Sequence, residues 1–191
     1  AELAAVTELD VSGRQIADLT GVEHFFALET LNANNNRLTA LDLSGNPKLE
    51  RLYCRHNALE TLDVSGNPEL AFIETFDNRL LEFDGSMLKK LKFLHIGYNR
   101  LTHLDMSGNP ALEGNGFVAA NNWLDALTLP DIADFQVEAA VFCEQNPRTG
   151  YDRVEWYQDA ACTRPIGEED LLPANGQTVY ARWIPNPYTV Y

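Results

Sequence analysis

A repeat of about 21 residues occupies the first two thirds of the chain and constrains its fold more than any other feature. Successive copies begin 21 residues apart, except the last, which begins 23 residues after its predecessor. The two extra residues fall in the Gly-rich stretch 114–116, and all later positions shift with them. Such a shared shift is expected of a stacked array. The aligned copies begin at Leu31, Leu52, Ile73, Leu94 and Phe117.

Apolar residues recur at fixed positions of every copy. One copy cannot bury them alone, whereas parallel strands stacked about 4.8 Å apart bury each column on the next. An asparagine also recurs five residues after each start, and its amide is expected to pair backbone groups of its own and the adjacent turn. The expected inward columns are Leu31, Leu52, Ile73, Leu94, Phe117; Ala33, Cys54, Thr75, Ile96, Ala119; Leu38, Leu59, Leu80, Leu101, Leu124; and Leu41, Leu62, Phe83, Leu104, Leu127; the asparagines are Asn36, Asn57, Asn78, Asn99 and Asn122.

A second series lies between these segments and reads as turns, because Ser, Gly, Asn and Pro dominate it. Its third member departs from the pattern. Gly85 takes the place of Leu43, and Met87–Leu88 take the place of Gly45–Asn46, so we expect an irregular turn face there. The series comprises LDLSGNP (41–47), LDVSGNP (62–68), FDGSMLK (83–89) and LDMSGNP (104–110).

The pattern LxxLxLxxNxL of these copies resembles the leucine-rich repeat family over about residues 1–130. The 21-residue spacing and the opening LDVSGRQIADLTGVEHFF (9–26) are similar to the arrays of bacterial, internalin-like surface proteins. The resemblance implies a mainly β fold, a leucine-rich repeat solenoid in which stacked parallel strands form a curved array. It also implies that the asparagine-bearing series lines the concave side.

The period ends after Pro130, and alternating residues predict strands at 135–145, 151–159 and 178–185. Residues 150–166 and 178–183 resemble the Listeria–Bacteroides repeat, the internalin B-repeat family. We therefore expect a small β-grasp-like or abbreviated β module over 131–185 that covers the open end of the solenoid, with 186–191 as the start of a next module or a tail. Its core is predicted to contain Trp156, Tyr157, Tyr180 and Trp183.

Residues that alternate with the inward columns should face outward and form the candidate binding surface. Exposed aromatics beside arginine are typical of recognition surfaces, although cross-strand pairing that stabilises the sheet explains them as well. The outward columns are Thr30, Arg51, Phe72, Phe93, Gly116; Asn32, Tyr53, Glu74, His95, Val118; Asn34, Arg55, Phe76, Gly97, Ala120; and Asn35, His56, Asp77, Tyr98, Asn121. The candidate ligand-binding residues are Arg51, Tyr53, Arg55, His56, Phe72, Phe76, Asp77, Phe93, His95 and Tyr98.

Other chemistry has weaker support. A column of Asp with Ser two residues later could bind Ca²⁺, but each pair is better explained as a cap on the backbone of its turn. His56 and Asp77 are outward neighbours on adjacent copies and could hold zinc, but His95 lies one copy further in another column, so a third ligand at suitable spacing is not obvious. Cys54 lies in an inward column, so a Cys54–His56 nucleophile is not favoured. No catalytic motif occurs, and we predict no enzymatic activity and no cofactor. The Asp column is Asp10, Asp42, Asp63, Asp84 and Asp105.

Charge and hydropathy exclude further classes of partner. The net charge is −14, and acidic residues exceed basic ones both in 1–130 (18 against 10) and in 131–191 (10 against 4). This balance argues against binding nucleic acid or anionic lipid. No apolar run reaches the roughly 18 residues that span a bilayer, so we expect no direct membrane insertion. The chain begins at Ala1 and ends inside a strand-like run, so we expect a processed or trimmed piece of a longer protein.

The family resemblance implies a secreted or cell-wall-associated recognition module, monomeric, that binds a host or microbial surface protein or glycan. Two alternatives remain: a structural spacer with no ligand of its own, and a metal-dependent or hydrolytic protein. Export would allow a disulfide between Cys143 and Cys162, and two separate thiols are equally consistent with the sequence.

Overall fold

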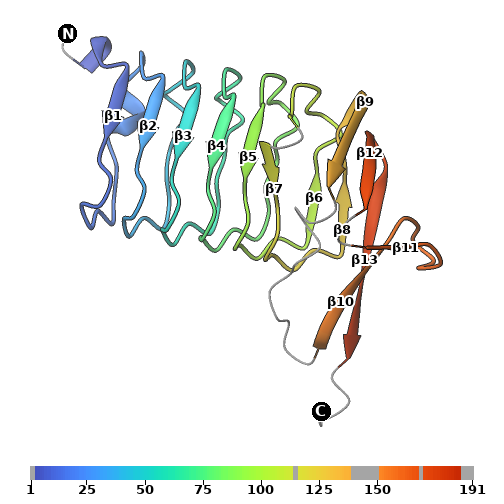
Figure 1. Ribbon diagram of the computed structural model, residues 1–191. Coiled ribbons are helices and arrows are strands. Elements are labelled where there is room, and N and C mark those ends of the chain that lie inside the picture. Colours follow the sequence, from blue (N-terminus) through green and yellow to red (C-terminus); the bar gives the residue numbers. More distant parts are fainter. Residues whose placement is uncertain (1–2, 114–115, 139–150, 168–169, 186–191) are drawn as a thin grey trace.

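The repeats fold into a solenoid whose turns, here called rungs, lie side by side (Figure 1). The computed structural model describes residues 3–113, 116–138, 151–167 and 170–185. Each rung contributes one short strand to a six-stranded parallel sheet, in chain order apart from β6. The described residues include two 3₁₀ helices, η1 (Leu3–Ala5) and η2 (Val22–His24), and no α-helix. The sheet strands are β1 (Glu8–Asp10), β2 (Thr30–Asn32), β3 (Arg51–Tyr53), β4 (Phe72–Glu74), β5 (Phe93–His95) and β7 (Phe117–Val118).

The predicted inward columns are confirmed. Leu31 pairs with Leu52, Leu52 with Ile73, and Ile73 with Leu94, so identical repeat positions stand in register. These four side chains are completely buried. The remaining columns belong to the same continuous core, in which Phe83 retains 8% exposure. Because burial comes from neighbouring rungs rather than from within one rung, the stack is stable only as an array.

The asparagine ladder is also confirmed, and Asn78 shows its geometry. Its Nδ2 donates to the carbonyl of Cys54 on the preceding rung (3.0 Å) and to the carbonyl of Thr75 on its own rung (3.1 Å). Its Oδ1 accepts the N–H of Leu59, again on the preceding rung (3.0 Å). One side chain thus pairs three buried backbone groups, and the two carbonyls also accept bonds from Asn57 and Asn99, so successive ladder asparagines share their acceptors. The same arrangement recurs at Asn36, Asn57, Asn99 and Asn122.

A second asparagine ladder lies in the turns that the sequence pattern identified only as turns. Asn67 is fully buried, and its Nδ2 donates to the carbonyls of Leu43 and Asn46 at 2.9 Å each. Asn46 and Asn109 make equivalent bonds to their preceding rungs. The third turn breaks this ladder, because the fully buried Leu88 stands there instead. The recurrence of asparagine at one repeat position was the signal that could have revealed it.

The C-terminal strands extend a sheet that begins in the solenoid. Val179 pairs with Leu127 where β13 runs antiparallel to β8, and β8 in turn lies parallel to β6. The resulting five-stranded sheet has the order β11-β10-β13-β8-β6, while β9 and β12 form a separate antiparallel pair (Figure 1). The strands are β6 (His103–Asp105), β8 (Ala126–Thr128), β9 (Asp131–Glu138), β10 (Tyr151–Tyr157), β11 (Pro165–Ile166), β12 (Leu171–Asn175) and β13 (Thr178–Pro185).

Trp156 and Val179 belong to the same core cluster as the solenoid leucines, so these strands pack onto its last rung. Of the predicted module core, Trp156 and Tyr157 are buried, whereas Tyr180 and Trp183 are only partly buried. The strand predicted at 135–145 begins earlier, at Asp131, and is described to Glu138. The rest of that predicted strand, Cys143 and the tail 186–191 lie outside the described residues.

Loss of a ladder asparagine should destabilise the stack. Asn78→Ala leaves the buried N–H of Leu59 without its partner and removes the bonds to the carbonyls of Cys54 and Thr75, which keep their bonds to Asn57 and Asn99. We expect a decrease in the free energy of unfolding of about 2–4 kcal/mol, measured by urea denaturation. Asn35→Gly is the control: Asn35 is exposed, its side chain makes no hydrogen bond to the described part of the chain, and its φ is +56°. That change should alter stability by less than about 1 kcal/mol. Equal effects of the two substitutions would contradict the role of the ladder.

Candidate functional site

The ten predicted binding residues lie together on one face of the six-stranded sheet. They come from β3, β4, β5 and the loops directly after these strands. Register aligns Arg51 with Phe72 and Phe72 with Phe93 on neighbouring strands. We call this set the sheet surface: Arg51, Tyr53, Arg55, His56, Phe72, Phe76, Asp77, Phe93, His95 and Tyr98.

Aromatic rings form a row along the middle strands of the sheet surface. Phe72 and Phe93 stack with centroids 4.2 Å apart and planes 3° from parallel, and Tyr53 tilts against Phe72 at 5.2 Å. All three side chains are partly buried. The row buries ring area between neighbouring strands, so it stabilises the sheet even with nothing bound.

A second row lies where the strands end, centred on Phe76. His95 stacks on its ring at 4.4 Å, His56 meets it edge-on at 5.0 Å, and the Arg55 guanidinium lies 5.5 Å from its centroid. Arg55 also lies 3.6 Å from the carboxylate of Glu74. Burial lowers the pKa of His95 below its ordinary value, so its ring is neutral at pH 7.

His56 and Asp77 are neighbours across adjacent rungs, as the alternation predicted. The Nδ1 of His56 lies 2.6 Å from Oδ2 of Asp77, and both side chains are exposed. His95 is turned onto Phe76 instead. Within the described ranges, no group of three His, Cys, Asp or Glu side chains could hold a metal ion.

The backbone of one outward column is left-handed on every rung. The φ angles of Asn35, His56, Asp77, Tyr98 and Asn121 lie between 53° and 57°. Asn and Asp tolerate this region, whereas a bulky aromatic residue rarely adopts it. Tyr98 is nevertheless 53% exposed and makes no ring contact with any residue that the structure describes. The structure therefore holds Tyr98 in a costly conformation with its side chain projecting into solvent.

The outward columns are partly wrong: Gly116 is buried, Asn121 is 8% exposed, and one column fails at three positions. Asn34 and Ala120 are 7% and 9% exposed, and Gly97 is buried as well. The strands have already ended at this position, because β2 stops at Asn32, so alternation no longer applies. The Oδ1 of Asn34 instead accepts the N–H of Arg55 from the next rung at 2.9 Å.

The Asp column on the opposite side of the solenoid caps its turns, as the preferred interpretation proposed. Asp63 Oδ1 accepts the N–H of Ser65 at 2.9 Å, and the same bond recurs from Asp10 to Asp105. The bonds from the Ser65 backbone and hydroxyl lower the pKa of Asp63, although Asp42 and Asp84 oppose that shift. Hydrogen bonding thus outweighs repulsion within the column.

Cys54 has a structural role in the core. Its side chain is fully buried, and burial raises the pKa of the thiol to about 12, so it is not a nucleophile at neutral pH. Cys162 is a free thiol.

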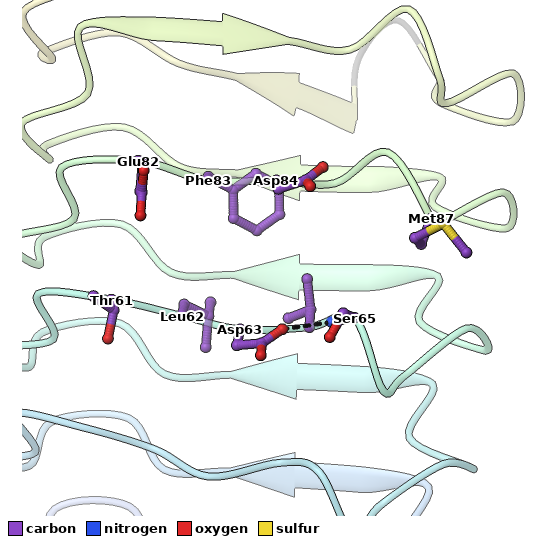
Figure 2. Close-up of a pocket in the computed structure, with 9 residues that line it drawn as sticks. Thr61, Leu62, Asp63, Ser65, Glu82, Phe83, Asp84 and Met87 are labelled. Carbon is purple, nitrogen blue, oxygen red and sulfur yellow. Dashed lines mark hydrogen bonds between the residues drawn. The ribbon is translucent and has the colours of Figure 1, made fainter.

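A hollow of about 400 Å³ lies between two rungs on the Asp-column side (Figure 2). It is lined by segments 61–65 and 82–84 together with Met87. The hollow lies at the irregular third turn. The sequence predicted that this turn departs from the repeat, but it did not predict a hollow there.

Comparisons with known proteins agree with this fold. Residues 27–65 match the family described as Leucine Rich repeats (2 copies). The functional domain of InlJ from Listeria monocytogenes, which includes a cysteine ladder, is 37% identical; the match covers 58% of this chain and 24% of that one, with a TM-score of 0.57. A leucine-rich repeat protein of Leptospira interrogans is 24% identical over 58% of this chain and 29% of its own, with a TM-score of 0.52. No curated protein matches the sequence.

The chain therefore carries leucine-rich repeats and forms a mainly β solenoid of parallel strands similar to those of Listeria internalins. It spans about a quarter of the InlJ chain and less than a third of the Leptospira one. The described part of the chain includes no helix long and apolar enough to cross a membrane.

The Asp column should affect stability at low pH. Because the folded state lowers the pKa of Asp63, this carboxylate stabilises the fold above its unfolded pKa of about 3.9. That contribution is lost as pH falls through the folded value. We expect the Asp63 carboxyl carbon to titrate below the range of an unperturbed aspartate in an NMR titration, and Ser65→Ala to move the midpoint upward. A wild-type Asp63 midpoint within the range of an unperturbed aspartate would contradict the capping role, and a midpoint that Ser65→Ala leaves unchanged would contradict the contribution of the hydroxyl.

Tyr98 should cost stability. Asn35 and Asn121 show that asparagine suits this position, so Tyr98→Asn relieves backbone strain. We expect the free energy of unfolding to rise by about 1 kcal/mol, measured by urea denaturation. A decrease of that size would mean that the ring contributes packing that outweighs the strain.

Proposed function

We propose that this protein is a non-catalytic recognition module whose sheet surface binds a host or microbial surface protein or glycan. The observation that carries the proposal is Tyr98, an exposed aromatic side chain on a left-handed backbone beside braced rings. A residue that costs stability and packs against no ring in the described part of the chain is best explained by a contact made outside the chain.

The surroundings of Tyr98 support this function. The braced rings of Phe76 and His95 lose little side-chain entropy on binding, because their positions are already fixed. Arg51 is exposed at the end of the Phe72 row and forms no ion pair within the described residues. Rigid aromatics with a free guanidinium nearby are typical of binding hot spots. Leucine-rich repeat solenoids of the internalin kind are in general binding modules rather than enzymes.

We further propose that the protein acts outside the cell, secreted or attached to the cell wall, as the internalin-like fold suggests. In this arrangement residues 1–130 form the recognition solenoid, and residues 131–185 form a B-repeat-like module that spaces it from the surface. The pairing of β13 with β8 fits such a module, because it covers the last rung and leaves the sheet surface free.

The alternative is a structural spacer without a ligand, and the stacking of Phe72 on Phe93 favours it. The spacer function and the recognition function predict different effects when Phe93 and Tyr98 are substituted. Under either function Phe93→Ala should lower the free energy of unfolding by about 1–3 kcal/mol, because the stacked ring is lost. Only under the recognition function should the unbraced Tyr98 matter for binding.

The test begins with a screen of the wild-type protein against arrays of extracellular proteins and of glycans. For any ligand found, we expect Tyr98→Ala to weaken binding at least about tenfold by surface plasmon resonance. Phe26→Ala is the matched control, since Phe26 is 57% exposed but lies between η2 and β2, off the sheet surface. Full affinity in the Tyr98 variant would rule out this surface, and a screen without hits would favour the spacer.

A further inference from the structure

We infer that the hollow on the Asp-column side binds a lysine- or arginine-bearing segment of a partner protein, at a site separate from the sheet surface. The hollow lies between the rung segments Thr61–Ser65 and Glu82–Met87. In Figure 2 the Phe83 ring and Leu62 lie between the two segments, flanked by the carboxylates of Asp63, Glu82 and Asp84.

The hollow exists because the third turn departs from the repeat. Phe83 replaces a leucine, and its ring lies over Gly85: a Cβ on Gly85 would stand 2.9 Å from the ring. Gly85 is therefore needed for this ring position, and the side chain found there in other rungs is missing. Within the described residues, no backbone hydrogen bond joins segment 61–64 to segment 82–85, nor segment 41–44 to segment 61–64, so the side chains of the third turn account for the hollow.

The same rung exposes apolar side chains at both ends. Leu81 is 58% exposed and Met87 62% exposed, and they account for two of the five large exposed hydrophobic residues in the described chain. The equivalent positions in the neighbouring rungs hold Glu60 and Gly66. Met87 lines the hollow, and Leu81 directly precedes its lining residue Glu82, so these exposed apolar groups gather beside one hollow, which indicates a docking surface rather than scattered surface leucines.

The charges around the hollow identify the occupant. Asp63, Glu82 and Asp84 form no ion pair with any described residue, and no basic side chain lines the hollow. A second hollow beyond Phe83 is different, because Lys89 Nζ donates to the carbonyl of Gly108 on its wall. A second copy of this chain, with a net charge of −14, would be repelled. An extended segment with cationic and apolar side chains is complementary to this hollow, because the cations would pair with the carboxylates and the apolar groups would pack on the Phe83 ring.

The two methionines of the chain provide the test. Met87 lines the hollow, and Met106 is fully buried on the next rung, so labelling both methyl groups with ¹³C gives one reporter and one internal control. The probe is a capped hexapeptide of alternating lysine and leucine, titrated to about 1 mM, beside a glutamate–leucine peptide. We expect the Met87 methyl signal to shift saturably with the lysine peptide only, while the Met106 signal stays unchanged.

Substitutions then separate this site from general charge attraction. Glu82→Gln with Asp84→Asn should weaken binding about tenfold, and the asparagine can still cap its turn. Asp42→Asn, on a regular rung, is the matched control and should leave the affinity unchanged. An unshifted Met87 signal, or equal weakening by Asp42→Asn, would overturn the inference. So would a Met87 shift produced by Ca²⁺ alone, which would indicate a cation site, or one that follows dimerisation.

Discussion

The buried asparagine amide is the interaction on which the rest of this structure depends. The strands are only two or three residues long in the parallel sheet, so most of each rung is irregular backbone passing through the core. Such backbone is stable only when its polar groups are paired. Asn78 pairs three of them and links two rungs. The ladder thereby fixes how the loops after the strands leave the sheet, and these loops carry His56, Asp77 and Tyr98.

The sequence was sufficient to predict the features that repeat. The inward columns, the first asparagine ladder and the capping role of Asp63 all follow from one period, because neighbours in the stack are equivalent residues. Predictions failed where strand geometry ends: Asn34 lies beyond β2 and turns inward. The pairing of Thr178–Tyr180 with Ala126–Thr128 could not be predicted, because it joins distant segments that share no repeat. The hollow beside Phe83 depends on packing between rungs, which the pattern does not specify.

The two sides of the solenoid carry different chemistry on the same scaffold. On the sheet surface, stacked rings such as Phe72 and Phe93 stabilise the strands, and Tyr98 projects from them. On the opposite side, the Asp–Ser turns continue through one irregular rung, which adds the Phe83 ring and carboxylates that form no ion pair with any described residue. A repeat makes such departures informative. Equivalent positions usually carry similar residues for the same structural reason. A residue that differs unfavourably, as Tyr98 and Met87 do, therefore indicates a contact made outside the chain.

The continuous sheet from β6 to β11 also has a mechanical consequence. β13 runs antiparallel to β8 of the last solenoid rung and is flanked on its other side by β10. Tension along β13 would therefore act in shear on both rows of backbone hydrogen bonds, which must break together rather than one after another. The junction between repeats and C-terminal strands would behave as a clamp rather than a hinge, and a pulling force would reach the leucine core before these strands could peel away.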